Sequence, residues 1–344
     1  MINIKDKLNR TNILIKRSNN VDVEYVSSAD FEADIKAIND RIDELEDIDT
    51  NDYITKSEFN NQIDELKGEL RPKKIDATGF KFGGSTFTEF PDVFYFGNVS
   101  DFDGLFSGCE DLTTINADLD DAFGESTRSF MFDSCISLVE APEIDTILTT
   151  DMTAMYQNCE SLEKVPSYNI DVCASLSNMF TSCHNLVEVG DFTTYSGGEA
   201  SELLTVCDMF YGCSSLVQAP NIPTKNVEDF DGMFWNCSAL ETVPEYDFSN
   251  ANSVVNIFNG CYNLTNFGGF KNIKINLPDN CGLVQCWKLS YETLINIING
   301  LYNFRANGDN TTTRTIKLNY MVISKLTEDD IAMATSKGWV ITGD

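Results

Sequence analysis

The chain has 344 residues, of which 42% are hydrophobic, so it is long enough to bury a sizeable core in two or three structural units. Its formal net charge of −30 argues against nucleic acid and anionic membranes as partners, because like charges repel. No apolar run approaches the length of a membrane-spanning helix, so we expect no membrane insertion.

Residues 1–27 are predicted to form an extended, basic arm. The first 20 residues contain five Lys or Arg and one Asp, whereas residues 21–70 carry a net charge of −12. The arm would therefore suit an acidic surface of its own assembly. Its apolar cluster Ile13–Ile15 is shorter than the core of a secretion signal, so we expect synthesis in a cytoplasm and reduced cysteines. The candidate anchoring residues are Lys5, Lys7, Lys16 and Arg17.

Residues 28–71 have the apolar spacing of a coiled-coil stalk. Apolar residues alternate at intervals of four and three, with an interruption around residues 49–53, after which Thr55–Glu58 forms a capping box. Isoleucine-rich seams favour three strands, so we predict a homotrimer; the alternative is a pair of helices packed on the next domain. The candidate trimerisation residues are Phe31, Ile35, Ile38, Ile42, Leu45, Phe59, Ile63, Leu66 and Leu70.

Residues 99–289 repeat a unit of 24 to 30 residues, after a predicted N-terminal cap at residues 72–98. Such a period indicates a solenoid, in which each unit buries its apolar face only by stacking on its neighbours. A degenerate eighth unit at Cys286 completes the series, and residues 290–344 would form a C-terminal cap. The seven regular units align on Cys109, Cys135, Cys159, Cys183, Cys213, Cys237 and Cys261.

Each unit has the same order of signals around its cysteine. A Ser, Thr or Asp eight residues before the cysteine resembles a helix N-cap, and apolar residues follow with i, i+3, i+4 spacing. A leucine three residues after the cysteine and an apolar or small residue three further on indicate a short strand. We therefore predict an α/β solenoid of leucine-rich repeats, with a short strand and a short helix per turn, following an N-terminal α-helical coiled coil.

The segment Met131-Phe132-Asp133-Ser134-Cys135-Ile136-Ser137-Leu138 resembles the BspA-like leucine-rich repeats of bacterial surface proteins, and the resemblance covers roughly residues 98–290. The C-terminal segment, with its helical pattern at Leu294–Leu301 and Lys337-Gly338-Trp339, is similar to the closing cap after such repeats. Members are commonly adhesins and ligand-binding surfaces, which the resemblance implies for this chain. The basic arm and interrupted coiled coil, including Asp52–Phe59, resemble bacteriophage fibre proteins.

The sequence offers little catalytic chemistry. A straight file of cysteines one strand apart does not converge on zinc or form disulfides, so we interpret these thiols as buried and structural. His184, the single histidine, occupies a column of mixed composition and is expected to be exposed. The identical segments Asp101–Gly104 and Asp229–Gly232 are interpreted as caps rather than calcium ligands. We predict no catalytic residue, no metal site and no cofactor.

Adjacent aromatic residues are the candidate ligand-binding feature. Tyr211 and Trp235 lie two residues before their cysteines, and Tyr262 and Trp287 lie one residue after theirs. Exposed neighbouring rings bind sugars or partner side chains; alternatively they cover a neighbouring subunit or the cap. The rival candidates, on the strand side of the repeats, are Val139, Glu140, Val187, Glu188, Val217 and Gln218.

We expect a non-enzymatic fibre or appendage protein of a tailed-phage virion, on the head or the tail, made in the host cytoplasm. Its partners would be its own copies, other virion proteins and a host-surface glycan or protein. The alternatives are a bacterial cell-surface adhesin, a glycan depolymerase with a carboxylate pair ~5–9 Å apart, and a structural decoration without a ligand.

Overall fold

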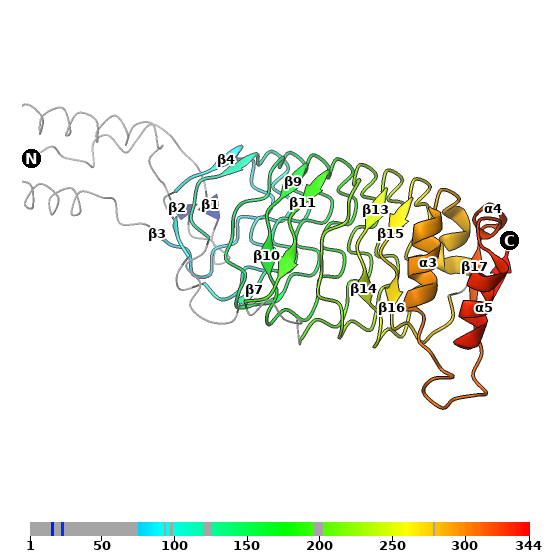
Figure 1. Cartoon of the computed structure of the whole chain (residues 1–344). Helices are drawn as coiled ribbons and strands as arrows, with labels where there is room; N and C mark the ends of the chain where they lie inside the picture. The colour runs from blue at the N-terminus through cyan, green and yellow to red at the C-terminus, as the bar shows by residue number, and fades with distance from the viewer. Residues whose placement is uncertain are drawn as a thin grey trace, which may run out of the picture.

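The computed structural model describes residues 15–16, 22–23, 75–92, 94–96, 99–119, 126–195, 202–277 and 279–344. The predicted stalk at 28–71 lies outside these residues, as do Lys5, Lys7 and Arg17 of the predicted arm. Within the arm, β1 (Ile15–Lys16) pairs antiparallel with β2 (Asp22–Val23). From residue 75 onward the chain winds into an elongated solenoid, with helices at its C-terminal end (Figure 1).

Short parallel strands line the solenoid in three ladders, because each complete unit contributes to all three sides. The first contains β4 (Glu89–Phe90), β6 (Thr114–Ile115), β9 (Lys164–Val165), β11 (Glu188–Val189), β13 (Thr242–Val243) and β15 (Asn266–Phe267). The second contains β3 (Ile75–Asp76), β5 (Phe94–Tyr95), β10 (Tyr168–Asn169), β12 (Phe192–Thr193), β14 (Tyr246–Asp247) and β16 (Phe270–Lys271). The chain is thus a repeat solenoid.

The third ladder follows the Ser, Thr or Asp positions that precede each cysteine by eight residues. It consists of β7 (Ser126–Thr127) paired with β8 (Thr149–Asp151), extended by single parallel bridges from Asp101 to Ser253. In five of the seven units the side chain at this position accepts a hydrogen bond from the backbone N–H two residues ahead, as Asp151 does from Thr153 at 2.8 Å. In the units of Thr127 and Ser253 that N–H donates instead to an aspartate of the preceding unit. The predicted capping chemistry is present, but it closes a turn rather than a helix.

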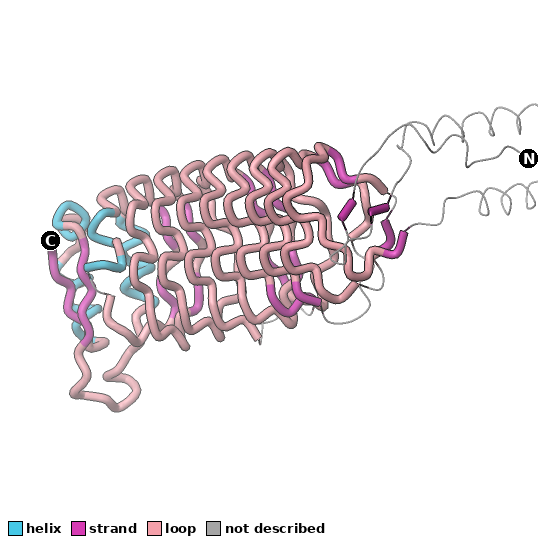
Figure 2. The backbone as a smooth tube through the Cα atoms, turned by 180° about the vertical axis from the view of Figure 1, so that it is seen from behind, coloured by secondary structure: helices cyan, strands magenta, loops and turns pink. Residues whose placement is uncertain are grey.

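The predicted short helix of each unit is replaced by two consecutive four-residue turns. Between residues 99 and 277, the described part of the chain contains no α-helix (Figure 2). In the first unit Leu105 donates to the Phe102 carbonyl and Cys109 to the Phe106 carbonyl, and Ser107 donates to the Gly104 carbonyl where the two turns join. The N–H groups of Gly104, Phe106 and Gly108 bond to the next unit. Gly104 and Gly108 have φ of 59° and 72°, as type II turns require at their third residue. Tandem turns and helices produce the same i, i+3, i+4 apolar spacing, which explains the error.

Aromatic rings stack through the centre of the solenoid. Neighbouring rings lie 5.2–5.9 Å apart between centroids, with planes within 16° of parallel. The stack contains Phe82, Phe106, Phe132, Tyr156, Phe180, Phe210, Phe234 and Phe258. Because each ring between the two ends of the stack contacts the units on both sides, the stack couples neighbouring units along this part of the rod.

Arg128 is the polar exception in an apolar column, and it is 1% exposed. Its guanidinium carbon lies 4.3 Å from the centroid of the Phe102 ring, and its Nε donates to the Thr149 hydroxyl at 3.1 Å. The buried cation therefore has both an aromatic and a hydroxyl partner, as burial of a charge demands.

The last unit and the C-terminal cap close the core. The eighth unit contains the 3-10 helices η2 (Asp279–Cys281) and η3 (Leu283–Gln285). The cap contains α3 (Tyr291–Gly300), β17 (Arg314–Leu318), α4 (Tyr320–Ile323), α5 (Glu328–Ser336) and β18 (Trp339–Gly343). Strand β17 pairs in parallel with β18 and, through Ile316, with Leu277 of the solenoid. Lys337 Nζ donates to the carbonyls of Ile298 and Asn299, which fixes the end of α3.

Candidate recognition surface

The turn geometry determines which columns of each unit face outward. The residues two before and one after each cysteine flank the end of the second turn, while the cysteine itself points inward and is 0% exposed in every regular unit. The four predicted aromatic residues occupy these two outward columns, and the structure brings them together as two pairs on adjacent units.

Tyr211 and Trp235 form the first pair. Their centroids are 5.0 Å apart and their planes meet at 81°, so the edge of one ring points at the face of the other. Both side chains are half-buried. In an edge-to-face pair the electropositive edge of one ring contacts the electronegative face of the other, and this attraction holds the two rings in place.

Tyr262 and Trp287 form the second pair, which is more open. Their centroids are 5.3 Å apart with planes 22° from parallel, and the side chains are 43% and 40% exposed. The next residues carry polar groups: Lys288 Nζ donates to Asn263 Oδ1 at 2.5 Å. Because the separation is close to the strand spacing, the rings stack along the rod. The exposed parts of both rings are accessible to a ligand.

His184 lies on the same corner, one residue after Cys183. It is exposed, and its Nδ1 lies 2.9 Å from the carbonyl oxygen of Gly212 on the next unit. This places one ring on each of five successive units: His184, Tyr211, Trp235, Tyr262 and Trp287. From the sequence alone, His184 is not grouped with the aromatic pairs. The register of the turns places it on the same corner of the solenoid.

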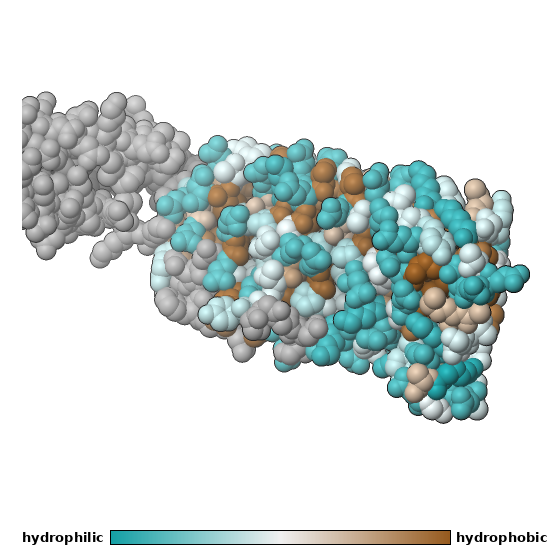
Figure 3. Space-filling model, viewed as in Figure 1, coloured by the Kyte–Doolittle hydropathy of each residue, from teal (hydrophilic) through white to brown (hydrophobic). Residues whose placement is uncertain are grey.

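The strand side of the repeats is a second exposed surface. Val139, Val187 and Val217 occupy the same position of their units and are 41%, 52% and 41% exposed. Hydrophobic residues gather on the face around β9 and β11 (Figure 3). Glu163 and Glu241 occupy the same column in other units, so this face mixes apolar and acidic side chains.

The aspartates of the two identical segments have structural partners. Asp101 pairs with Lys81 at 3.1 Å, and Asp103 Oδ1 accepts the Ser129 N–H at 2.8 Å. Asp231 Oδ1 accepts the Val255 N–H at 2.6 Å. Burial, together with nearby Asp229 and Asp231, raises the pKa of Asp208 above its ordinary value. Within the described ranges no group of three or more His, Cys, Asp or Glu is placed to hold a metal ion.

The cysteine column is buried among backbone carbonyls. Cys135, Cys159 and Cys183 donate to the carbonyls of the stacked aromatic residues one unit back, at 3.2, 3.1 and 3.0 Å. Burial raises the pKa of these thiols well above its ordinary value. Three cysteines lie off the column; Cys173 and Cys281 are buried, whereas Cys207 is half-buried.

Several predicted positions lie outside the described side chains. They comprise the trimerisation residues and three of the four anchoring residues; the fourth, Lys16, lies in β1, where only the backbone is described. Among the described residues no helix is both long and apolar enough to cross a membrane.

A protein-family model described as "Mycoplasma protein of unknown function, DUF285" matches residues 81–194, 117–221 and 150–269. These overlapping matches follow the repeats and together span more than half of the chain. No curated protein matches the chain.

Proposed function

The chain belongs to the DUF285 family of repeat proteins, and from the surface of its solenoid we propose that it is a non-catalytic recognition rod: a fibre or appendage of a tailed-phage virion that binds a host-surface glycan or protein. One observation carries this proposal. The interior repeats the same stacked rings and thiols, whereas the outward corner carries aromatic pairs on only four of its units.

The interior supports a display role. A continuous, closely packed apolar core makes a stiff support, so differences between units are confined to exposed columns. Rigid aromatic side chains provide contact area at a small cost in conformational entropy, which favours them as anchors of a binding surface.

The chemistry of the described residues also favours binding over catalysis. His184, which any serine-type triad would need, is exposed and engages a backbone carbonyl. The acidic residue with the raised pKa, Asp208, lies beside Cys207 and Asp229 in a turn region. A glycan depolymerase would in addition need a groove for the glycan with one carboxylate on each side of the bond that is cleaved.

The test is binding of the labelled full-length chain to whole host cells and to an immobilised glycan panel. We expect the double substitution Trp235→Ala and Trp287→Ala to abolish binding. The matched control is Tyr195→Ala, which removes an aromatic ring that is 84% exposed and lies apart from the two pairs. Unchanged binding by the double variant, with the fold retained, would contradict the proposed surface.

The second candidate is a bacterial cell-surface adhesin. The matching family model is described from Mycoplasma proteins, which favours a bacterial over a phage source. Antibody detection on purified virions and on intact bacterial cells separates the two.

Light scattering tests the predicted stalk by measuring the mass of the protein in solution. We expect a trimer for the full chain and a monomer for residues 75–344. A monomer in both would remove the fibre arrangement and favour the adhesin.

A further inference from the structure

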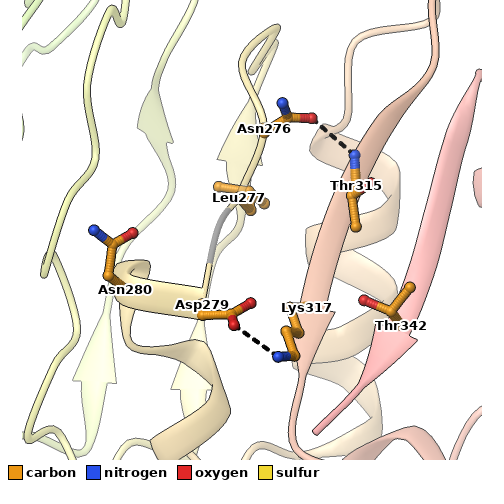
Figure 4. Close-up of a pocket in the computed structure, with 7 residues that line it drawn as sticks. All are labelled: Asn276, Leu277, Asp279, Asn280, Thr315, Lys317 and Thr342. Carbon is orange, nitrogen blue, oxygen red and sulfur yellow. Dashed lines mark hydrogen bonds and ion pairs between the residues drawn. The ribbon is translucent and has the colours of Figure 1, made fainter.

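A polar groove lies where the solenoid meets the C-terminal cap; it includes η2 of the eighth unit, which also carries Trp287. It has a volume of about 430 Å³. Residues 276–277 and η2 form one wall, and the outer face of the β17–β18 sheet forms the other (Figure 4). The polar side chains that line it are Asn276, Asp279, Asn280, Thr315, Lys317 and Thr342.

The groove has a rigid floor. Leu277 is buried and bridges to Ile316; its N–H donates to the Thr315 carbonyl at 2.9 Å, and its carbonyl accepts the Lys317 N–H at 3.3 Å. Along β17, Ile316 and Leu318 point into the core, so Thr315 and Lys317 point outward. Thr342 is paired with Lys317 in the sheet register and lines the same face.

Neighbouring groups fix three of the polar side chains of the groove, those of Asn276, Asp279 and Lys317. Asn276 Oδ1 accepts the Thr315 N–H at 3.0 Å, which orients the amide and leaves its two Nδ2 hydrogens as donors. Lys317 Nζ contacts Asp279 at 2.7 Å and Asp344 at 3.2 Å. A ligand would therefore meet oriented donors and acceptors, which reduces the entropy lost on binding.

The charges select the class of ligand. Lys317 already has two carboxylate partners, so it is not available as a strong anion site, and the −30 charge of the chain repels anions. Amide, hydroxyl and carboxylate groups instead complement a molecule that carries many hydroxyl groups, each both donor and acceptor. The volume falls within the usual range for small-ligand sites.

We propose that this groove binds a neutral saccharide, as a second site separate from the aromatic pairs. The proposal rests on the proposed recognition function and names its ligand class and a place for it at the C-terminal end of the rod. A sugar here would bridge the last solenoid unit and the cap sheet through Asn276, Lys317 and Thr342.

The test is saturation-transfer NMR on the full-length chain with glucose, galactose, mannose and N-acetylglucosamine as probes. We expect transfer to at least one sugar, and its loss in Thr342→Trp, which fills the groove. Thr335→Trp, which adds the same ring at an exposed position of α5, should retain the transfer, and circular dichroism checks the fold of both variants.

No transfer to any of the four sugars would overturn the proposal, as would equal transfer in Thr342→Trp. Trp287→Ala separates this site from the aromatic pairs. If that variant loses the transfer while Thr342→Trp keeps it, the groove proposal fails and the aromatic surface stands. If cell binding survives loss of Trp235 and Trp287 while the groove signal remains, the groove stands instead.

Discussion

The thiol of Cys159 donates to the carbonyl oxygen of Phe132 on the preceding unit, with 3.1 Å between sulfur and oxygen. The same carbonyl accepts the backbone N–H of Cys135, also at 3.1 Å. One oxygen therefore closes the turn of its own unit and accepts a bond from the next. This contact recurs along the column, so the cysteines connect successive units through hydrogen bonds.

Replacing Cys159 by alanine tests that role. The substitution removes a buried sulfur and its hydrogen bond, so we expect the free energy of unfolding to fall by about 1–2 kcal/mol. Denaturant titration followed by circular dichroism measures the change. Ser215→Ala, outside the core, is the control, and an equal effect of both substitutions would contradict the structural role of the thiol.

Phe130 adopts φ of 57° at the third residue of a turn, and its side chain is 45% exposed. Left-handed backbone costs a non-glycine residue about 1–2 kcal/mol, and little burial offsets that cost here. We expect Phe130→Gly to raise the midpoint of thermal unfolding. Phe132→Gly, at a buried position two residues later, should lower it strongly. A lower midpoint for Phe130→Gly would show that the ring has a stabilising contact.

Gly260 has φ of 84°, and a Cβ at this position would lie 3.0 Å from the Cα of Asn236. Gly104 has φ of 59° but meets no atom closer than 3.8 Å. Both alanine substitutions carry the conformational cost, and only Gly260→Ala adds contact with the backbone of a neighbouring unit. We expect Gly260→Ala to destabilise the protein more than Gly104→Ala in denaturant titrations. Equal losses of unfolding free energy would show that the neighbouring unit moves away from residue 260 without strain.

Cys207 is the half-buried cysteine, whereas the other ten are buried. Burial, and then the carboxylate of Asp208, raises the pKa of the Cys207 thiol to about 12. Because the thiolate is the reactive form, alkylation by iodoacetamide should be slow at pH 8 and rise about tenfold per pH unit. Mass spectrometry of timed samples measures it.

Asp208→Asn removes the neighbouring charge and should accelerate labelling of Cys207 at constant pH. Asp111→Asn, an exposed carboxylate in the first unit, is the matched control and should change nothing. Rapid labelling of the unaltered protein at pH 8 would contradict the raised pKa.

Asp330 caps α5 by accepting the N–H of Thr327 at 2.8 Å and its hydroxyl at 2.7 Å. These bonds lower the pKa of the carboxyl below its ordinary value of 3.8. The stabilisation is therefore fully present above that value and is lost as the pH falls through the lower, folded-state pKa. We expect Asp330→Asn to lower the thermal midpoint at neutral pH, and the difference to close in strong acid. A difference in thermal midpoint that stays constant as the pH falls would contradict a stabilising role of the Asp330 carboxylate that is lost on protonation.

The period, the inward columns and the adjacency of the aromatic pairs followed from the sequence, because stacking forces equivalent positions into register. The helix prediction failed because tandem turns share its apolar spacing. A signal in the sequence is the frequency of Gly and Asn five and one before the cysteine of each regular unit, where the backbone is left-handed, as at Asn178 and Ser182 or Gly232 and Asn236. Two such positions four apart indicate turns, since a helix has no left-handed residue in its interior.

By itself, then, the sequence determined the repeat and its buried columns, since both depend on local periodicity and on the need to bury apolar surface. The tertiary structure alone decided the ring orientations and the polar groove. Tyr262 and Trp287 are 25 positions apart, and their angle depends on packing between units. The groove exists because Leu277 pairs with Ile316, although helix α3 lies between these two residues in the sequence. A contact between such distant segments produces no periodic pattern in the sequence.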